Sequence, residues 1–184
     1  MTVAKALQFR SFEDYLSVPP PSLPEGHFEY WDGELVEVMT ESLLNDSIAK
    51  YLMFLLMNMG TPLELICIHS CEVVVPGRPR TRFPDLVVLD EAHLELLKKR
   101  STITDKMPPP RLLVEVASPG DEDSDNYQRD YVQKPQQYAA IGVREYWIID
   151  PDRDVIKVGL LVDGSYQFQD FTGNSRIASL TFPA

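Results

Sequence analysis

The sequence predicts an α/β (α+β) protein built on a mixed β-sheet flanked by helices. An Asp-Gly dipeptide between apolar runs marks a β-hairpin near each end of the chain. Between the hairpins, apolar residues at helical spacing alternate with short apolar runs typical of buried strands. Helices and strands that intermix in this way favour a mixed sheet over a purely parallel one. The 184 residues suit one domain, residues 1–184, of which we expect residues 1–10 to be flexible.

The N-terminal part predicts a short helix followed by a hairpin. Ser11 is a good helix N-cap and acids follow it, so residues 11–16 are expected to be helical. A proline-rich segment, residues 19–26, ends this helix. Residues 28–31 and 34–39 flank Asp32-Gly33, the dipeptide that favours a two-residue hairpin turn. The first strand of this hairpin carries Glu29.

The longest predicted helix covers residues 41–59, where apolar residues recur at helical spacing before Gly60 and Pro62. Residues 63–68 and 71–75 then read as strands. Cys67, His69 and Cys71 raise the question of a metal site. In an extended chain the two cysteine Cα atoms would lie about 13 Å apart, too far for one zinc ion or a disulfide. Only a turn at His69-Ser70 would bring them together, so we expect ordinary core cysteines.

Two short apolar strands each carry an acid. Residues 84–89 form one of them, with Asp85 at its start. A helix over residues 91–100 and a brief strand over 102–104 follow it. The run 108–120 is apolar, bounded by prolines and interrupted by Glu115. An ionised Glu115 there would lose several kcal/mol in desolvation unless a cation or hydrogen-bond donors compensate it.

The C-terminal third predicts a helix, a strand and a hairpin. The acids of residues 121–125 lack the ligand spacing of a calcium loop and read as a solvated, mobile loop. The helix that follows reaches residue 141, with Gly142 as its stop. Pro135 interrupts this helix and puts the direction of Lys134 in question, unless the proline takes the first position of a restarted helix. Residues 145–149 form a buried strand. Residues 155–162 and 166–171 pair around Asp163-Gly164.

Asp85 and Glu115 would lie side by side if their strands are neighbours in the sheet. Two adjacent carboxylates repel each other unless a divalent cation lies between them, and Mg²⁺ prefers such oxygen ligands. A bound metal lowers the pKa of water and offsets charge on a phosphate. A cationic side chain would complete a site for phosphodiester hydrolysis. Ala117, two residues after Glu115, offers none, so Lys134 on the following helix is the next candidate.

Each of these residues also has a purely structural interpretation. Asp85 would then cap a turn, Glu115 would form a buried ion pair with Arg111 or Arg82, and Lys134 would be a solvated charge. Glu29 would be a surface strand residue. The aromatic residues are expected to fill the core rather than to stack on bases.

Net charge limits how the chain would bind nucleic acid. At −11, the protein cannot rely on generic electrostatic attraction to phosphates. A local patch formed by Arg78, Arg80 and Arg82 would have to contact the substrate backbone. The structural alternative is a solvated loop.

Taken together, the motifs resemble the Uma-two family of restriction endonucleases, within the PD-(D/E)XK nuclease superfamily. The resemblance covers roughly residues 12–183 and rests on five segments in order: 28–34, 82–85, 114–119, 130–134 and 145–151. It implies a restriction-endonuclease-like fold, with Asp85 and Glu115 as metal ligands. It further implies that Lys134 replaces a lysine usually found at the position of Ala117. Glu29 would add a third carboxylate or support the metal ligands through another residue.

The expected function is a DNA endonuclease that depends on Mg²⁺, with Mn²⁺ as a substitute. A non-catalytic binding module with the same fold, or an unrelated metal-dependent phosphoesterase, remains an alternative. By analogy with enzymes that cut both strands, we expect a homodimer. No apolar run reaches the ~18 residues of a membrane span, and residues 1–10 lack the apolar stretch of a secretion signal. A cytoplasmic location is therefore expected.

Overall fold

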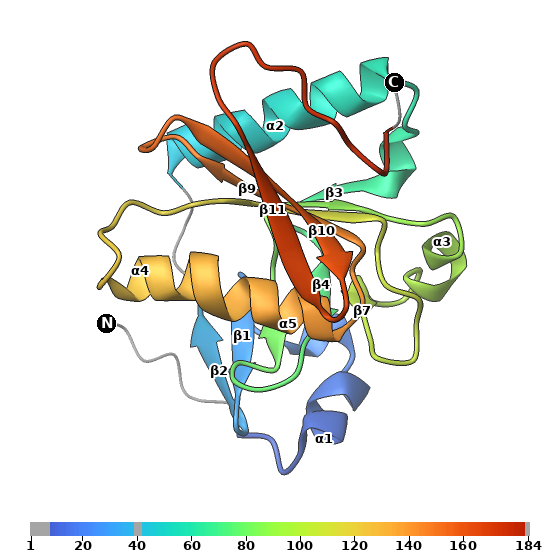
Figure 1. Ribbon diagram of the computed structural model, residues 1–184. Helices are drawn as coiled ribbons and strands as arrows, with labels where there is room; N and C mark the ends of the chain where they lie inside the picture. The colour runs from blue at the N-terminus through green and yellow to red at the C-terminus, as the bar shows by residue number, and fades with distance from the viewer. Residues whose placement is uncertain (1–7, 39–41, 183–184) are drawn as a thin grey trace.

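The computed structural model describes residues 8–38 and 42–182. A six-stranded sheet forms its centre (Figure 1). Its strands are β3 (Ile66–Ile68), β6 (Leu86–Val88), β8 (Leu112–Val116), β9 (Glu145–Asp150), β10 (Val155–Val162) and β11 (Ser165–Phe171). Their order across the sheet is β11-β10-β9-β8-β6-β3. The pair β8 and β9 is parallel and the other four pairs are antiparallel, so the predicted mixed sheet is confirmed.

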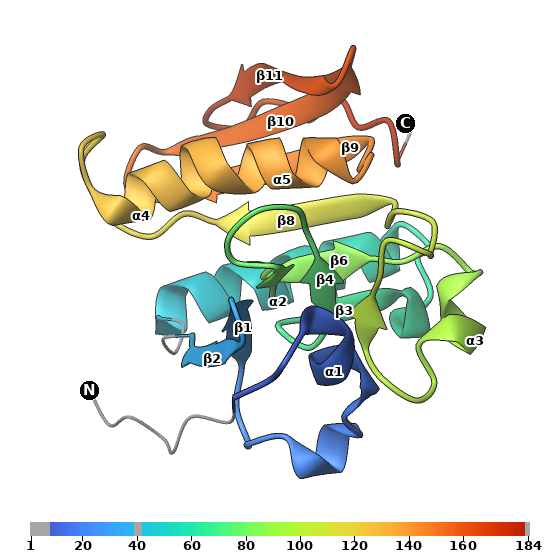
Figure 2. The same ribbon diagram turned by 90° about the horizontal axis from the view of Figure 1, so that it is seen from below.

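Helices cover both faces of this sheet. Helix α2 (Leu43–Asn58) lies on one side, and a helical segment formed by α4 (Asp125–Tyr127), η3 (Gln128–Gln133) and α5 (Lys134–Ala140) lies on the other (Figures 1 and 2). Side chains alternate between the faces along β8. Leu112 and Val114 belong to the core under α2, whereas Leu113 packs in the core that contains Tyr138 of α5. Glu115 therefore points to the α5 side.

The remaining strands form two smaller sheets. The hairpin of β1 (Phe28–Trp31) and β2 (Glu34–Glu37) turns at Asp32 and Gly33, whose φ angles of 46° and 97° fit a two-residue hairpin turn. The other small sheet has the order β5-β4-β7, formed by β5 (Thr81–Arg82), β4 (Glu72–Val74) and β7 (Thr102–Ile103). The expected hairpins at both ends of the chain are thus present, the second being β10 and β11.

The N-terminal segment packs as a small aromatic cluster. Ser11 caps α1 (Phe12–Ser17) by accepting a hydrogen bond from the main-chain N–H of Asp14 (3.1 Å), and η1 (Pro20–Ser22) follows. Phe12 packs with Tyr30 of β1 in the same cluster. Of residues 1–10, which were expected to be flexible, 1–7 lie outside the described part of the chain. Phe9 is held by a main-chain hydrogen bond to Gly33 (2.8 Å).

Pro135 lies in the first turn of α5, so the regular α-helix restarts there, as one of the two sequence interpretations allows, and the helical path does not end. The chain stays helical through Lys134, whose φ and ψ are −59° and −47°, and α5 continues past the proline. The six residues of η3 before Lys134 are π-helical. A proline lacks the N–H of the regular ladder and crowds the carbonyl four residues earlier, and the wider π turn accommodates both effects. Lys134 consequently projects from a continuous helical surface.

Two other predicted elements are shorter in the structure. Residues 63–65 form a 3₁₀ turn, η2 (Leu63–Leu65), before β3 begins. The helix predicted over residues 91–100 shrinks to α3 (His93–Leu96). Arg100 leaves the helix because its guanidinium bonds the carboxylate of Glu72 (3.2 Å) and the carbonyl of Tyr15 (3.1 Å). The predicted extensions of β2 to residue 39 and of α2 to residue 41 fall outside the described residues.

Across residues 8–38 and 42–182, no helix is both long enough and apolar enough to cross a bilayer.

Candidate functional site

Asp85 and Glu115 meet across two neighbouring strands. In the antiparallel pair, Leu86 of β6 lies opposite Val114 of β8, so Asp85, one residue before, lies opposite Glu115. Both side chains are buried, with residue exposures of 4% and 1%. Asp85 Oδ2 accepts a hydrogen bond from the main-chain N–H of Val116 (2.6 Å). The short apolar strands thus place two acids together inside the protein, next to the helical segment on the α5 side.

Lys134 contacts Glu115 of this pair and a third acid, Asp130. Its Nζ lies 2.7 Å from Glu115 Oε2 and 2.9 Å from Asp130 Oδ1. Tyr138, one turn further along α5, donates its hydroxyl to Glu115 Oε1 (2.6 Å). Asp130, Lys134 and Tyr138 are four residues apart, so one side of the helical segment carries all three. Both oxygens of Glu115 are therefore held from α5.

Burial and charge set the protonation of this cluster. Burial raises the pKa of Glu115 to about 7; Lys134 opposes the rise, whereas Asp85 adds to it. Burial alone would lower the pKa of Lys134, but the carboxylates of Glu115 and Asp130 outweigh it and raise that pKa above its usual value. Burial likewise works to raise the pKa of Asp130, yet Lys134 and Arg129 lower it to about 2. Lys134 stays a cation at neutral pH, and Glu115 is the acid that changes charge there.

Asp130 also fixes the loop that follows β8. Its Oδ2 accepts a hydrogen bond from the main-chain N–H of Ser118 (3.1 Å), and Arg129 bonds both Asp130 and the Ser118 hydroxyl. The end of β8 is thereby tied to the helix that carries Lys134. These hydrogen bonds keep Lys134 next to Glu115.

Glu29 binds an arginine instead of joining the two acids. Its Oε1 lies 2.9 Å from Arg82 Nη1, and the Arg82 side chain is buried at 2% exposure. Arg82 also donates to the side-chain oxygens of Gln137 (2.9 Å) and Gln133 (3.3 Å), which flank Lys134 and Tyr138 on the helical segment. Glu29 therefore neutralises a buried cation that links β5 to η3 and α5.

The three arginines predicted to contact substrate do not form one surface. Arg82 is buried, and Arg80 is half-buried with its guanidinium 4.4 Å from the centre of the Phe12 ring. Arg78 alone of the three is well exposed, and it pairs with Asp32 (2.6 Å). The predicted three-arginine patch is therefore not formed as one surface, because Arg82 is held inside the protein; substrate contact by Arg78 and by the half-buried Arg80 stays a prediction.

The purely structural interpretation paired Glu115 with Arg111 or Arg82, and neither arginine contacts it. Arg111 donates to the carbonyl of Thr181 (3.2 Å), and Arg82 pairs with Glu29. The ion pair of Glu115 is with Lys134, so the buried acid and the predicted lysine do come together.

His69 contributes to the site in a way that sequence patterns did not indicate. Its φ of 49° marks a turn after β3, and its Nδ1 lies 3.2 Å from Asp85 Oδ1. Its Nε2 lies 4.0 Å from Asp46 Oδ1 of α2. The sequence had connected His69 only with the neighbouring cysteines. The sequence could have indicated Tyr138 and Asp130 as site residues, since each lies four residues from Lys134 and so on the same side of a helix.

The cysteines are core residues, as expected. Cys67 and Cys71 are free thiols; Cys71 is fully buried and Cys67 packs against the same core. The turn at His69 brings the two thiols into contact, which lowers the pKa of Cys67. Among the described residues, no cluster of three or more His, Cys, Asp and Glu side chains is arranged to hold a metal ion.

The site residues nevertheless fit a hard divalent cation. Asp85 and Glu115 supply two facing carboxylates, and the charge of Asp85 already raises the pKa of Glu115. A cation between them would relieve this repulsion. Mg²⁺ is commonly held by one or two carboxylates with water and phosphate oxygens in the other positions. Two protein carboxylates are therefore enough for that ion.

The mixed sheet with helices on both faces is a nuclease-like fold, as a comparison with a solved structure shows. A solved structure from Anabaena variabilis ATCC 29413, described as a "putative nuclease belonging to DUF820", shares the fold with a TM-score of 0.64. The two sequences are 16% identical, and the match covers 92% of this chain and 89% of that one.

The chain belongs to the Uma2 family, described as "Putative restriction endonuclease", whose family model matches residues 12–184. The resemblance seen in the sequence motifs is thereby confirmed. No curated protein matches the chain significantly.

Proposed function

We propose that this protein is a Mg²⁺-dependent endonuclease that hydrolyses phosphodiester bonds in DNA. The observation that carries the proposal is the convergence of Asp85, Glu115 and Lys134, three residues far apart in the sequence, at one buried point. Membership of a family described as restriction endonucleases supports the same activity. Mn²⁺ is expected to substitute for Mg²⁺.

In this proposal Asp85 and Glu115 hold the metal, which lowers the pKa of water and offsets charge on the phosphate when bound. His69 and the N–H of Val116 fix the orientation of the Asp85 carboxylate. Tyr138 fixes Glu115. Lys134 orients or deprotonates the attacking water and balances negative charge; the neighbouring carboxylates raise its pKa and keep it a cation before a metal binds.

A non-catalytic binding module is the second candidate, and one observation favours it. Glu115 and Lys134 are 1% and 12% exposed at their side chains and already satisfy each other. A phosphate must displace part of this pair to reach the acids. In a module that binds its partner without cleaving it, the ion pair between Glu115 and Lys134 would stay intact.

Cleavage of plasmid DNA separates these candidates. With Mg²⁺ or Mn²⁺, the purified protein is expected to nick or linearise supercoiled plasmid, and excess chelator should stop it. Binding of DNA without cleavage would instead support the binding module. Turnover of a small phosphate diester with no effect on DNA would point to an unrelated phosphoesterase.

Metal binding is expected to weaken as the pH falls. The folded protein holds a proton on Glu115 below its pKa of about 7, and a metal has to displace that proton. Affinity should therefore drop about tenfold per pH unit below 7 and level off above it. Calorimetric Mg²⁺ titration from about pH 8 to pH 5.5 measures this. A flat affinity across that range would show that Glu115 is not a ligand.

A further inference from the structure

The outer face of helix α2 is apolar and exposed. Six of its side chains have exposures between 38% and 82%: Leu43, Leu44, Tyr51, Phe54, Leu55 and Met57. The inner face packs on the sheet through Ala49 and Leu56, which are 1% and 2% exposed. A contiguous exposed patch of large apolar side chains on a globular protein marks a surface that contacts another molecule. The described residues of this chain leave its outer side open.

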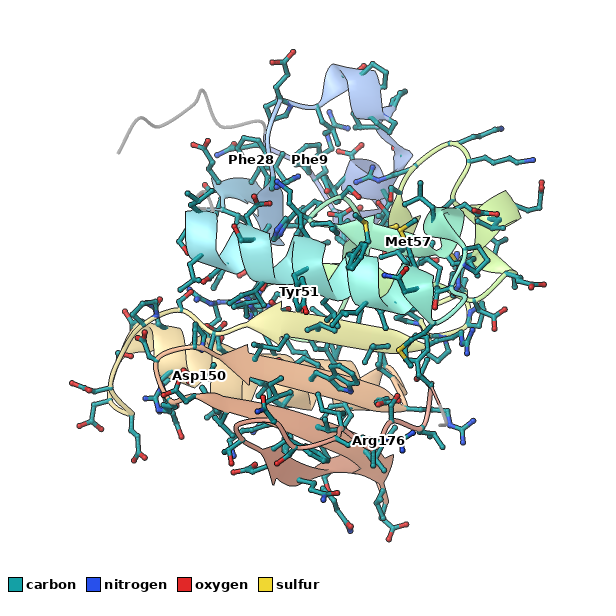
Figure 3. The ribbon with its side chains drawn as sticks, turned by 90° about the horizontal axis from the view of Figure 1, so that it is seen from above. Phe9, Phe28, Tyr51, Met57, Asp150 and Arg176 are labelled. Atoms are coloured by element: carbon teal, nitrogen blue, oxygen red, sulfur yellow. The ribbon has the colours of Figure 1, made fainter. Side chains whose placement is uncertain are left out.

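The six side chains form two adjacent rows along the whole helix. Leu44, Tyr51 and Leu55 share one row, spaced by seven and four residues. The second row is formed by Leu43, Phe54 and Met57, and the exposed Lys50 (62%) stands in it between Leu43 and Phe54. The rings of Tyr51 and Phe54 stack with centres 6.5 Å apart and join the rows. Figure 3 shows α2 from this outer side, with Tyr51 and Met57 labelled.

The charges on α2 limit which kinds of molecule its outer face can bind. The chain carries a net charge of −11, whereas the charged residues of α2 are Asp46 and Lys50, which pair with each other at 2.6 Å. The face thus presents no free cation to a nucleic acid or an anionic membrane. It also presents no uncompensated anion, so two copies can approach here without the repulsion that the rest of the acidic surface would impose.

We propose that this face binds a second copy of the chain, α2 against α2, in a two-fold symmetric dimer. Met59 and Leu63, 61% and 56% exposed, extend the face beyond the helix. At ~200 Å² for a fully exposed large side chain, the eight residues offer on the order of 900 Å² per copy. A standard stable interface buries about 800 Å² per partner. A two-fold axis lets the same patch cover itself.

Sedimentation velocity over a range of concentrations tests this dimer in the full chain. Wild type is expected to dimerise, and the double variant Tyr51→Glu/Phe54→Glu to raise the dissociation constant at least about a hundredfold, because each copy would bury two unpaired charges. Ser47→Arg adds a bulky charge between the rows without removing an apolar contact of the monomer, and should act the same way. Leu96→Glu, at an exposed leucine (47%) of α3, is the matched control and should leave the dimer intact.

Three results would overturn the proposal. The first is a wild-type protein that stays monomeric at about 100 µM. The second is a dimer that persists in both Tyr51→Glu/Phe54→Glu and Ser47→Arg, with circular dichroism showing that they are folded. The third is a monomer that floats with vesicles of neutral lipid, since the face would then be a membrane contact. The proposal is independent of nuclease activity, so its failure leaves the proposed function standing.

Discussion

Glu115→Gln is expected to lower the rate of Mg²⁺-dependent DNA cleavage at least about a thousandfold while the protein stays folded. The substitution keeps the shape of the side chain and removes the charge that a cation requires. Loss of several kcal/mol of metal-derived stabilisation corresponds to three or more powers of ten in rate. Folding should survive because the amide can still accept from Tyr138, and Lys134 retains Asp130 as its partner. Plasmid cleavage under single-turnover conditions provides the rates.

The chain offers a close control for this variant. Glu145 on the neighbouring strand β9 is also a fully buried glutamate, but it bonds Trp147 and the main chain of Thr181 on the opposite side of the sheet. Glu145→Gln should keep wild-type cleavage. Asp85→Asn should match the loss in Glu115→Gln. Wild-type rates in either site variant would remove the assignment of these two acids as metal ligands.

Lys134→Met is expected to destabilise the fold by about 3–5 kcal/mol at pH 8, since it leaves buried carboxylates without their cation. The loss should shrink at lower pH. Lys134 lowers the pKa of Glu115, so in the variant that pKa lies above about 7. A folded-state pKa above the unfolded value means that stability falls as the pH rises between the two. Protonation of Glu115 near pH 5 should therefore recover part of the loss.

Urea unfolding at pH 8 and at pH 5 measures both parts of this prediction. Lys157→Met is the matched control, because Lys157 pairs with the half-exposed Asp170 on the surface hairpin. That substitution should cost less than about 1 kcal/mol at either pH. An equal cost of Lys134→Met at the two pH values would show that Glu115 does not gain a proton when the lysine is lost.

Local chemistry explains why much of the fold was predictable. The turns at Asp32-Gly33 and Asp163-Gly164 need residues that accept positive φ, and these dipeptides supply them. The strands around Asp85 and Glu115 were recognisable because they are short apolar runs bounded by loops. Their pairing stayed conditional in the sequence, because Asp85 and Glu115 meet only if the two strands are neighbours, and a cation has to compensate both charges.

Other features depend on contacts that sequence spacing does not encode. The sequence left open whether Pro135 interrupts the helix or starts a new one, and the π-helical turn before it lets α5 begin at Lys134 on the same path. Arg80 and Arg82 lie in a loop that looks solvated, yet Phe12, Glu29 and Gln137 come from distant segments to receive them. His69 reaches Asp85 only because the chain turns sharply after β3. Such pairings arise from tertiary packing, which overrides local propensity.

The most direct test of the site is a titration of the protein with Mn²⁺, in which electron paramagnetic resonance measures the concentration of free Mn²⁺. Wild type should bind Mn²⁺ at a site that is lost in both Asp85→Asn and Glu115→Gln and kept in Glu145→Gln. Competition by Mg²⁺ should release the bound Mn²⁺. Binding by Glu115→Gln that equals the wild type, or no binding by the wild type at neutral pH, would contradict a metal site between Asp85 and Glu115.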